Sequence, residues 1–152
     1  MKNTAYTAFV AAGMSLALAA SADASERKVK MSELPAPVQR AVQERSQGAT
    51  VKGLTVEDEN GVVVYEAELD VNGKTTDISF DKDGNVVSLE EETSLDRVPQ
   101  AARTAIEKAA GKSKITLVET VTEKGAIFYE AHIKKFLHTS EVKVNANGER
   151  VP

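Results

Sequence analysis

The sequence predicts an α+β protein made of two tandem repeats, each with one helix packed on an antiparallel meander of about four strands. First, the nonapeptide GVVVYEAEL at residues 61–69 returns 64 residues later as GAIFYEAHI at residues 125–133. Second, each copy alternates with the period of a strand and follows a segment with the period of a helix. Third, Asn-Gly and Asp-Gly dipeptides, which favour tight hairpin turns, follow the alternating segments.

The duplication extends well beyond the nonapeptide. A self-match at an offset of 64 residues continues without a gap over about 55 positions, which indicates an internal repeat. The matched pairs include Pro35 with Pro99, Tyr65 with Tyr129, and Gly84 with Gly148. We therefore divide the chain into an N-terminal segment (25–33), a first repeat (34–92), a linker (93–97) and a second repeat (98–152).

The first 24 residues have the features of a secretory signal peptide. Lys2 precedes a short apolar run, and Ala22-Asp23-Ala24 provides a small-residue cleavage site near Ala24. We therefore expect a periplasmic or secreted protein. No later segment is apolar enough to span a bilayer, so stable membrane insertion is not expected. The chain has no cysteine, which excludes disulfides, thiol nucleophiles and thiolate metal sites.

Each repeat is predicted to open with a helix, over residues 35–47 and 99–110. Pro35 and Pro99 suit the first turn of a helix, where the missing N–H costs nothing. A glycine follows the end of each segment, as expected just beyond a helix C-terminus (Gly48 and Gly111).

The strands after each helix are predicted from alternating apolar and polar residues. In the first repeat one side carries apolar groups and the other carries acids (Val63, Tyr65, Ala67, Leu69 and Val71 against Glu66, Glu68 and Asp70). In the second repeat Ile127, Tyr129, Ala131 and Ile133 are predicted to face the helix. Acids on the other side are expected to be solvated, because an antiparallel sheet with one covered face exposes the other.

The repeated pattern resembles the PepSY-like family, a group related in architecture to the β-lactamase inhibitory protein. The resemblance rests on Leu34-Pro35 to Val38, on Val98-Pro99 to Ala102, on Tyr65-Glu66-Ala67-Glu68-Leu69 and on the segment DGNVVSLEEETSLDRVPQAARTAI from Asp83 to Ile106. It covers nearly all of the chain after the signal peptide. It implies an exported, non-catalytic module, linked in some relatives to the restraint of extracytoplasmic enzymes.

Charge is distributed unevenly between the two repeats. Residues 34–92 carry 13 acidic and 5 basic side chains, whereas residues 98–152 carry 6 acidic and 9 basic. Such asymmetry indicates either a surface that meets a charged partner or two halves that attract each other. Basic patches interleaved with aromatic residues are missing from the sequence, so nucleic acid is not an expected partner.

Catalytic chemistry is not predicted. Glu66 and Glu130 occupy matching positions, but solvated carboxyls lack the raised pKa that a catalytic acid needs. The sequence has no G-x-S-x-G motif, no glycine-rich phosphate loop and no acid cluster in a pocket-forming pattern. The acidic segment at residues 81–85 has its glycine fourth and strands on both sides, so we interpret it as a hairpin turn and not a calcium loop. No cofactor is expected.

The two histidines support an alternative function. His132 and His138 both belong to the second repeat, and adjacent antiparallel strands bring such residues close together if the register allows it. The alternative is therefore a periplasmic metal- or small-ligand-binding protein that uses this region. No known ligand spacing supports the site, and no residue is assigned as a metal ligand.

The largest difference between the repeats is at a hairpin tip, where Asn72-Gly73 is replaced by Phe136-Leu137. Two apolar groups next to lysines are typical of an anchor for a partner; the alternative is a longer tip, or a tip that packs against the other repeat. We expect an exported binding module that captures or restrains a protein or peptide of the cell envelope through its sheet face and hairpin tips. The candidate partner-binding residues are Glu66, Glu68, Asp70, His132, Lys134, Lys135, Phe136 and Leu137.

Overall fold

The structure is a computed structural model that describes residues 26–59 and 62–151. The predicted signal peptide and the Asn60-Gly61 turn lie outside the described residues. Within the described residues, no helix is long and apolar enough to cross a membrane.

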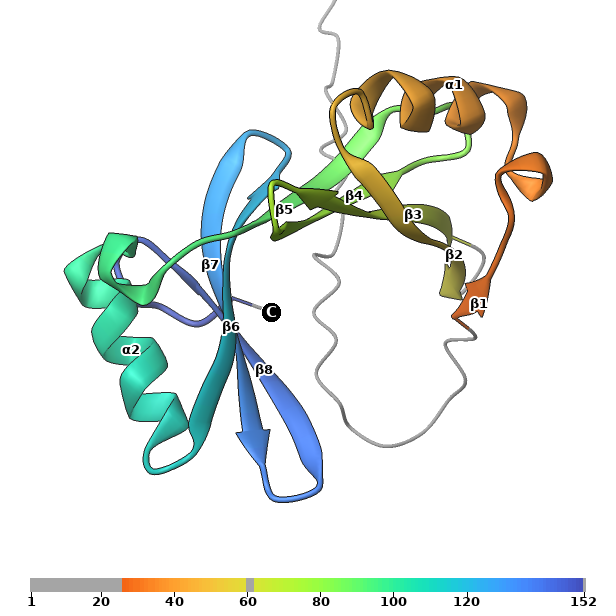
Figure 1. Cartoon of the computed structure of the whole chain (residues 1–152). Helices are drawn as coiled ribbons and strands as arrows, with labels where there is room; N and C mark the ends of the chain where they lie inside the picture. The colour runs from red at the N-terminus through yellow and green to blue at the C-terminus, as the bar shows by residue number, and fades with distance from the viewer. Residues whose placement is uncertain (1–25, 60–61, 152) are drawn as a thin grey trace, which may run out of the picture.

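The described chain forms one antiparallel sheet in which the strands follow each other in sequence order, from β1 to β8 (Figure 1). η1 (Met31–Glu33) lies in the N-terminal segment. The first repeat contains α1 (Ala36–Arg45), β2 (Thr50–Glu59), β3 (Val62–Val71), β4 (Lys74–Phe80) and β5 (Val86–Glu92). η2 (Leu95–Arg97) lies in the linker. The second repeat contains α2 (Gln100–Ala110), β6 (Lys114–Glu123), β7 (Ala126–Lys135) and β8 (His138–Asn145). A short strand that was not predicted, β1 (Arg27–Lys28), pairs with β2 at one edge.

The α+β class and the two helix-plus-meander units are confirmed. Corresponding strands begin 64 residues apart, as with β3 at Val62 and β7 at Ala126. The strand irregularity between Val51 and Gly53 also returns between Ile115 and Leu117. The second unit differs from the expected four strands, because it has three and ends in an isolated bridge between Val144 and Arg150.

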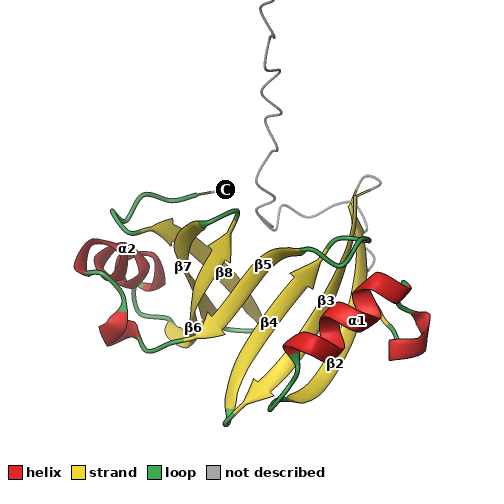
Figure 2. Cartoon of the chain, turned by 90° about the horizontal axis from the view of Figure 1, so that it is seen from above, coloured by secondary structure: helices red, strands yellow, loops and turns green. Residues whose placement is uncertain are grey.

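Both helices cover the same face of the sheet. Leu89 of β5 pairs with Thr122 of β6, and cross-strand partners share a face, so the covered face continues from one unit into the next. Each helix closes its own core (Figure 2). In the first, Val38 and Val42 pack near Phe80; in the second, Ala102 and Ile106 pack near Val144. Full burial of one such large apolar side chain contributes about 1.5–3 kcal/mol.

The predicted inward residues of β3 and β7 mostly face these cores. Tyr65 and Tyr129 pack against them, and Ala67 and Ala131 are fully buried. Ile127 is an exception: it lies near the start of β7, is 54% exposed and is not part of the core under α2. The opposite face of the sheet carries no helix in the described chain, and its side chains form the candidate site.

Candidate functional site

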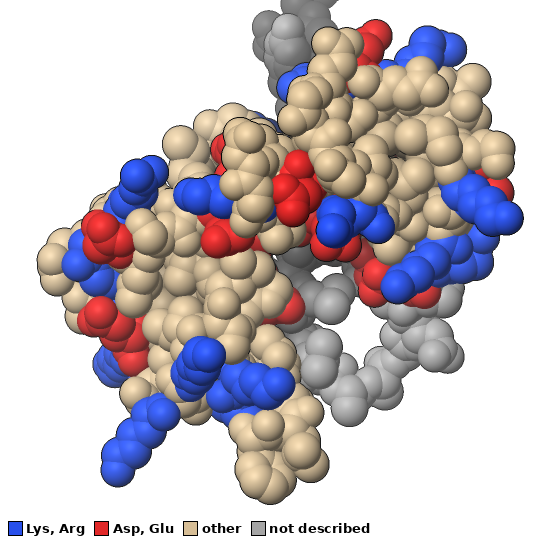
Figure 3. All heavy atoms as spheres, in the orientation of Figure 1, with Lys and Arg blue, Asp and Glu red and all other residues tan. Residues whose placement is uncertain are grey.

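A hollow of about 640 Å³ lies on the helix-free face of the sheet, where the two units meet. Acidic side chains gather at this junction in Figure 3. Carboxylates from all eight strands of the described sheet or their flanks contribute to its lining (Glu26, Glu57, Glu66, Asp77, Glu90, Glu119, Glu123, Glu130 and Glu141). The basic groups that line it are His132, Lys143 and Arg150. The hollow therefore has a strong excess of negative charge.

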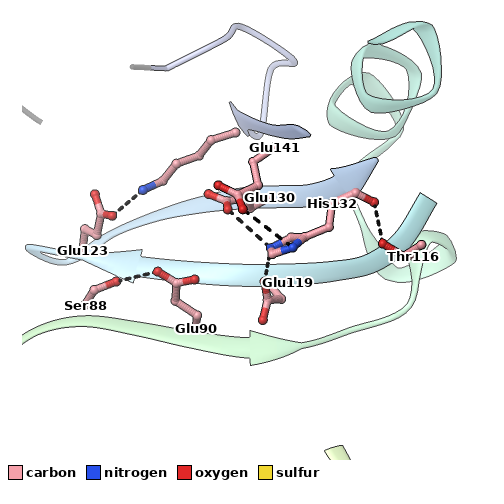
Figure 4. Close-up of polar contacts among 9 residues, drawn as sticks. Ser88, Glu90, Thr116, Glu119, Glu123, Glu130, His132 and Glu141 are labelled. Carbon is pink, nitrogen blue, oxygen red and sulfur yellow. Dashed lines mark hydrogen bonds and ion pairs between the residues drawn. The ribbon is translucent and has the colours of Figure 1, made fainter. Parts of the chain in front are cut away.

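His132 lies at the centre of the most compact group in the hollow. Its Nε2 atom is 3.2 Å from Oε2 of Glu119 on β6 and 3.7 Å from Oε1 of Glu130 on β7. Its Nδ1 atom is 3.8 Å from Oε1 of Glu141 on β8. The close-up in Figure 4 shows the imidazole ring among these three carboxylates. The hydrogen bond with Glu119 is the main reason that the pKa of His132 is raised.

Burial shifts the acid–base properties of several acids in the hollow. It raises the pKa values of Glu66, Asp77 and Glu130 to about 7, and the charges of neighbouring acids add to the effect. It also raises the pKa of Glu90. These carboxyls therefore have a strong preference for a proton or a nearby positive charge.

Two carboxylate oxygens in the hollow lack a partner. In the part of the chain that the structure describes, Oε1 of Glu119 and Oδ1 of Asp77 are buried without a hydrogen bond. The Glu119 side chain is only 2% exposed. Lys143, which also lines the hollow, pairs with Glu123 and does not supply this missing contact. An unmet buried carboxylate oxygen costs about 1–3 kcal/mol or more, so these two atoms indicate where a cationic group would be stabilised.

The expectation that Glu66 and Glu130 are simply solvated is wrong. Both are partly buried, and the Glu130 side chain is only 15% exposed. The statement that the sequence holds no pocket-forming acid cluster is wrong for the same reason. The pair still lacks the separation of pKa values that gives one acid and one base, since burial raises both to about 7.

The two histidines do not come together. The two-residue turn pairs Lys135 with His138, so Glu141 lies opposite His132. His132 therefore faces the hollow, whereas His138 lies at the exposed tip on the other face. The expected pairing fails because the register offsets the histidines by three positions along the strands.

The remaining candidate residues divide between the sheet and the tip. Glu68 is exposed, and Asp70 accepts a hydrogen bond from the backbone N–H of Gly73 at 2.8 Å, which gives it a role in the turn. Lys134 and Lys135 are exposed on β7. They lie beside the Phe136–Leu137 tip, and in Figure 3 blue side chains flank the tan end of this hairpin.

The tip itself is unusual in exposure and in backbone conformation. Phe136 is 90% exposed and Leu137 is 86% exposed. Phe136 also has a φ of +51°, in the left-handed region that a large side chain rarely adopts. The corresponding positions of the first repeat are Asn72 at +57° and Gly73 at +82°, and both residue types tolerate this conformation. The second repeat therefore presents apolar groups on a strained turn.

Sequence reasoning missed Glu119, which becomes the most buried acid of the site. A signal was present in the segment ITLVETV, residues 115–121, where one glutamate interrupts a strand of apolar residues and threonines. A charged residue in such a run is expected to have a partner when it is buried. Glu90 was missed as well. It lies on β5, and the pairing of β5 with β6 joins the two repeats and cannot be inferred from either repeat alone.

The fold is shared with solved bacterial proteins of low sequence identity. A BLIP-like protein from Bacteroides fragilis aligns with 76% of this chain and 82% of its own, at 18% identity and a TM-score of 0.51. A DUF2874 family protein from Bacteroides ovatus aligns over 78% of this chain and 85% of its own, at 18% identity and a TM-score of 0.57. The fold expected from the PepSY-like resemblance is confirmed by these matches.

A third match concerns location. A protein from Bacteroides eggerthii for which a periplasmic location is proposed aligns over 78% of this chain and 86% of its own, at 20% identity and a TM-score of 0.61. No model of a protein family matches the sequence, and no curated protein matches it. At these identities the similarity defines the fold, and function has to be argued from the site.

Proposed function

We propose that this chain is an exported, non-catalytic binding protein that captures a protein or peptide of the cell envelope. The observation that carries the proposal is the Phe136–Leu137 tip, which places two large apolar side chains almost fully in solvent. Exposed aromatic and aliphatic groups at the end of a rigid hairpin are suited to fill a pocket on a partner.

The strain at the tip supports a binding role. A large residue at positive φ costs about 1–2 kcal/mol relative to glycine, and the first repeat avoids this cost at Asn72-Gly73. Strained residues of this kind are concentrated at functional sites. The conformation of Phe136 is thus better explained by a contact with a partner than by the stability of the hairpin.

The acidic hollow supports the same proposal by its charge. A surface with many carboxylates attracts a partner that carries positive charge, and this attraction mainly increases the rate of encounter. The similarity of the fold to that of a BLIP-like protein is consistent with a protein-binding role. The proposed partner therefore has a basic surface beside an apolar pocket for the tip.

The test replaces the tip by that of the first repeat. We expect Phe136→Asn/Leu137→Gly to lose at least tenfold in affinity for a partner captured from an envelope extract, as measured with the purified pair. Asparagine tolerates the positive φ of this position better than phenylalanine does. The free energy of unfolding of the variant, measured in urea, is therefore expected to exceed that of the wild type by about 1 kcal/mol. A variant that loses affinity but gains stability shows that the tip contacts the partner, because unfolding cannot then explain the loss of binding.

Ile127→Asp serves as the matched control, since Ile127 is also exposed and apolar but lies away from the tip. It is expected to keep the affinity of the wild type. A partner that binds the tip variant as tightly as the wild type, or that is lost equally in the Ile127 control, would contradict the proposed anchor.

A further inference from the structure

The group around Glu119 has a feature that a protein partner does not explain. Its side chain is 2% exposed, one carboxylate oxygen faces the imidazole of His132, and the other oxygen has no hydrogen-bond partner among the described residues. Glu119 lines the hollow, so a small cation that enters the hollow would meet this unpartnered oxygen.

The donor atoms lie close enough together to share one metal ion. One ligand atom from each of Glu119, Glu130 and His132 lies within 4.8 Å of the others. Zinc–ligand bonds of about 2.1 Å place neighbouring atoms of a tetrahedral site about 3.4 Å apart. The distances from His132 Nε2 to the two carboxylates are 3.2 and 3.7 Å, close to that value.

We propose that Glu119, Glu130 and Nε2 of His132 bind one divalent transition-metal ion of the zinc class. One imidazole and two carboxylates favour zinc over calcium or magnesium, which prefer oxygen ligands alone. The three side chains leave a fourth position for water from the hollow. The ion would supply the positive charge that the buried Glu119 carboxylate lacks.

A fourth carboxylate is placed to orient the histidine. Oε1 of Glu141 faces Nδ1 of His132 at 3.8 Å, on the side of the ring away from the proposed ion. Metal-binding histidines commonly direct their second nitrogen to a carboxylate or to water, which fixes the ring. Glu141 is thus a positioning residue. The first repeat has Thr55 and Glu68 where the second has Glu119 and His132, so the site belongs to the second repeat alone.

The experiment is a zinc titration of the purified, chelator-treated protein by calorimetry at pH 7.5. We expect one zinc ion per chain, and at least tenfold weaker binding in both Glu119→Gln and His132→Ala. His138→Ala is the matched control, because this exposed histidine lies outside the group. It is expected to bind zinc as the wild type does. Calcium is expected to bind at least tenfold more weakly than zinc.

A spectroscopic measurement on the wild type tests the site even if a variant fails to fold. In the wild type, added zinc is expected to shift the ¹⁵N signal of His132 Nε2 and to leave the ring signals of His138 unchanged. The proposal is overturned if the wild type binds no zinc, if His132→Ala binds it unchanged, or if His138→Ala loses it equally. Calcium binding as tight as zinc binding and insensitive to His132→Ala would also overturn it.

Discussion

Gly148→Ala is expected to lower the free energy of unfolding by about 3 kcal/mol, the largest effect of any single substitution considered for this fold. A Cβ atom at this position would lie 2.5 Å from the carbonyl oxygen of Ala101 in α2, where no atom fits. Gly148 also has a φ of +80°, which adds the cost of a left-handed conformation. Gly84→Ala is expected to act similarly, with a contact of 2.7 Å to the carbonyl oxygen of Pro37 in α1.

Urea unfolding of both variants measures this effect, and Gly125→Ala isolates its cause. Gly125 has the same φ of +80° but nothing within 4 Å of its added Cβ atom. We therefore expect a loss of about 1 kcal/mol in the control, from backbone conformation alone. If Gly148→Ala costs no more than Gly125→Ala, then the helix does not rest on this turn as closely as the structure indicates.

The turns that contain Gly84 and Gly148 show why the repeat could be predicted from the sequence. The Asp81 carboxylate accepts hydrogen bonds from the N–H groups of Asp83 and Asn85, and Asn145 makes the equivalent contacts in the second repeat. The interpretation of residues 81–85 as a hairpin turn is thus confirmed. Turn chemistry, helix ends and strand alternation are local in the sequence, and all of them recur at the same offset.

The hollow could not be predicted in the same way. Glu66 and Glu130 alternate with apolar residues as solvated acids do, and nothing local distinguishes a solvated face from a recessed one. Both line one hollow together with residues of the other repeat, and the pairing of β5 with β6 joins the two repeats into one sheet. That contact is non-local, and it is also what brings Glu90 and Glu119 into the same hollow.

The position of His132 was partly within reach of sequence reasoning. Alternation correctly places it on the face opposite the helix, and the two-residue loop at Phe136-Leu137 sets the register of β7 against β8. That register puts Glu141, and not His138, opposite His132. The strand register that follows from a two-residue turn therefore predicts that His132 lies beside carboxylates and not beside His138.

The pH dependence of stability is the second large effect that we expect. Burial raises the pKa values of Glu66 and Asp77 to about 7 in the folded protein, from ordinary values of 4.5 and 3.8. Between these limits the folded state holds more protons than the unfolded chain, so the free energy of unfolding falls as the pH rises through this window. His132 acts in the same direction, because its raised pKa gives stability that is lost as the pH rises through its folded value.

We expect the metal-free protein to be less stable at pH 8 than at pH 5 by roughly 2 kcal/mol, a value reduced from the full shifts because both carboxyls retain some solvent contact. Urea unfolding in the presence of a chelator, at steps between these pH values, measures the slope. Glu66→Gln/Asp77→Asn is expected to flatten it and to raise stability at pH 8. Glu44→Gln, at an exposed position on α1, should leave it unchanged. Stability that is constant or rises from pH 5 to pH 8 would show that these carboxyls are solvated after all, as simple strand alternation suggests.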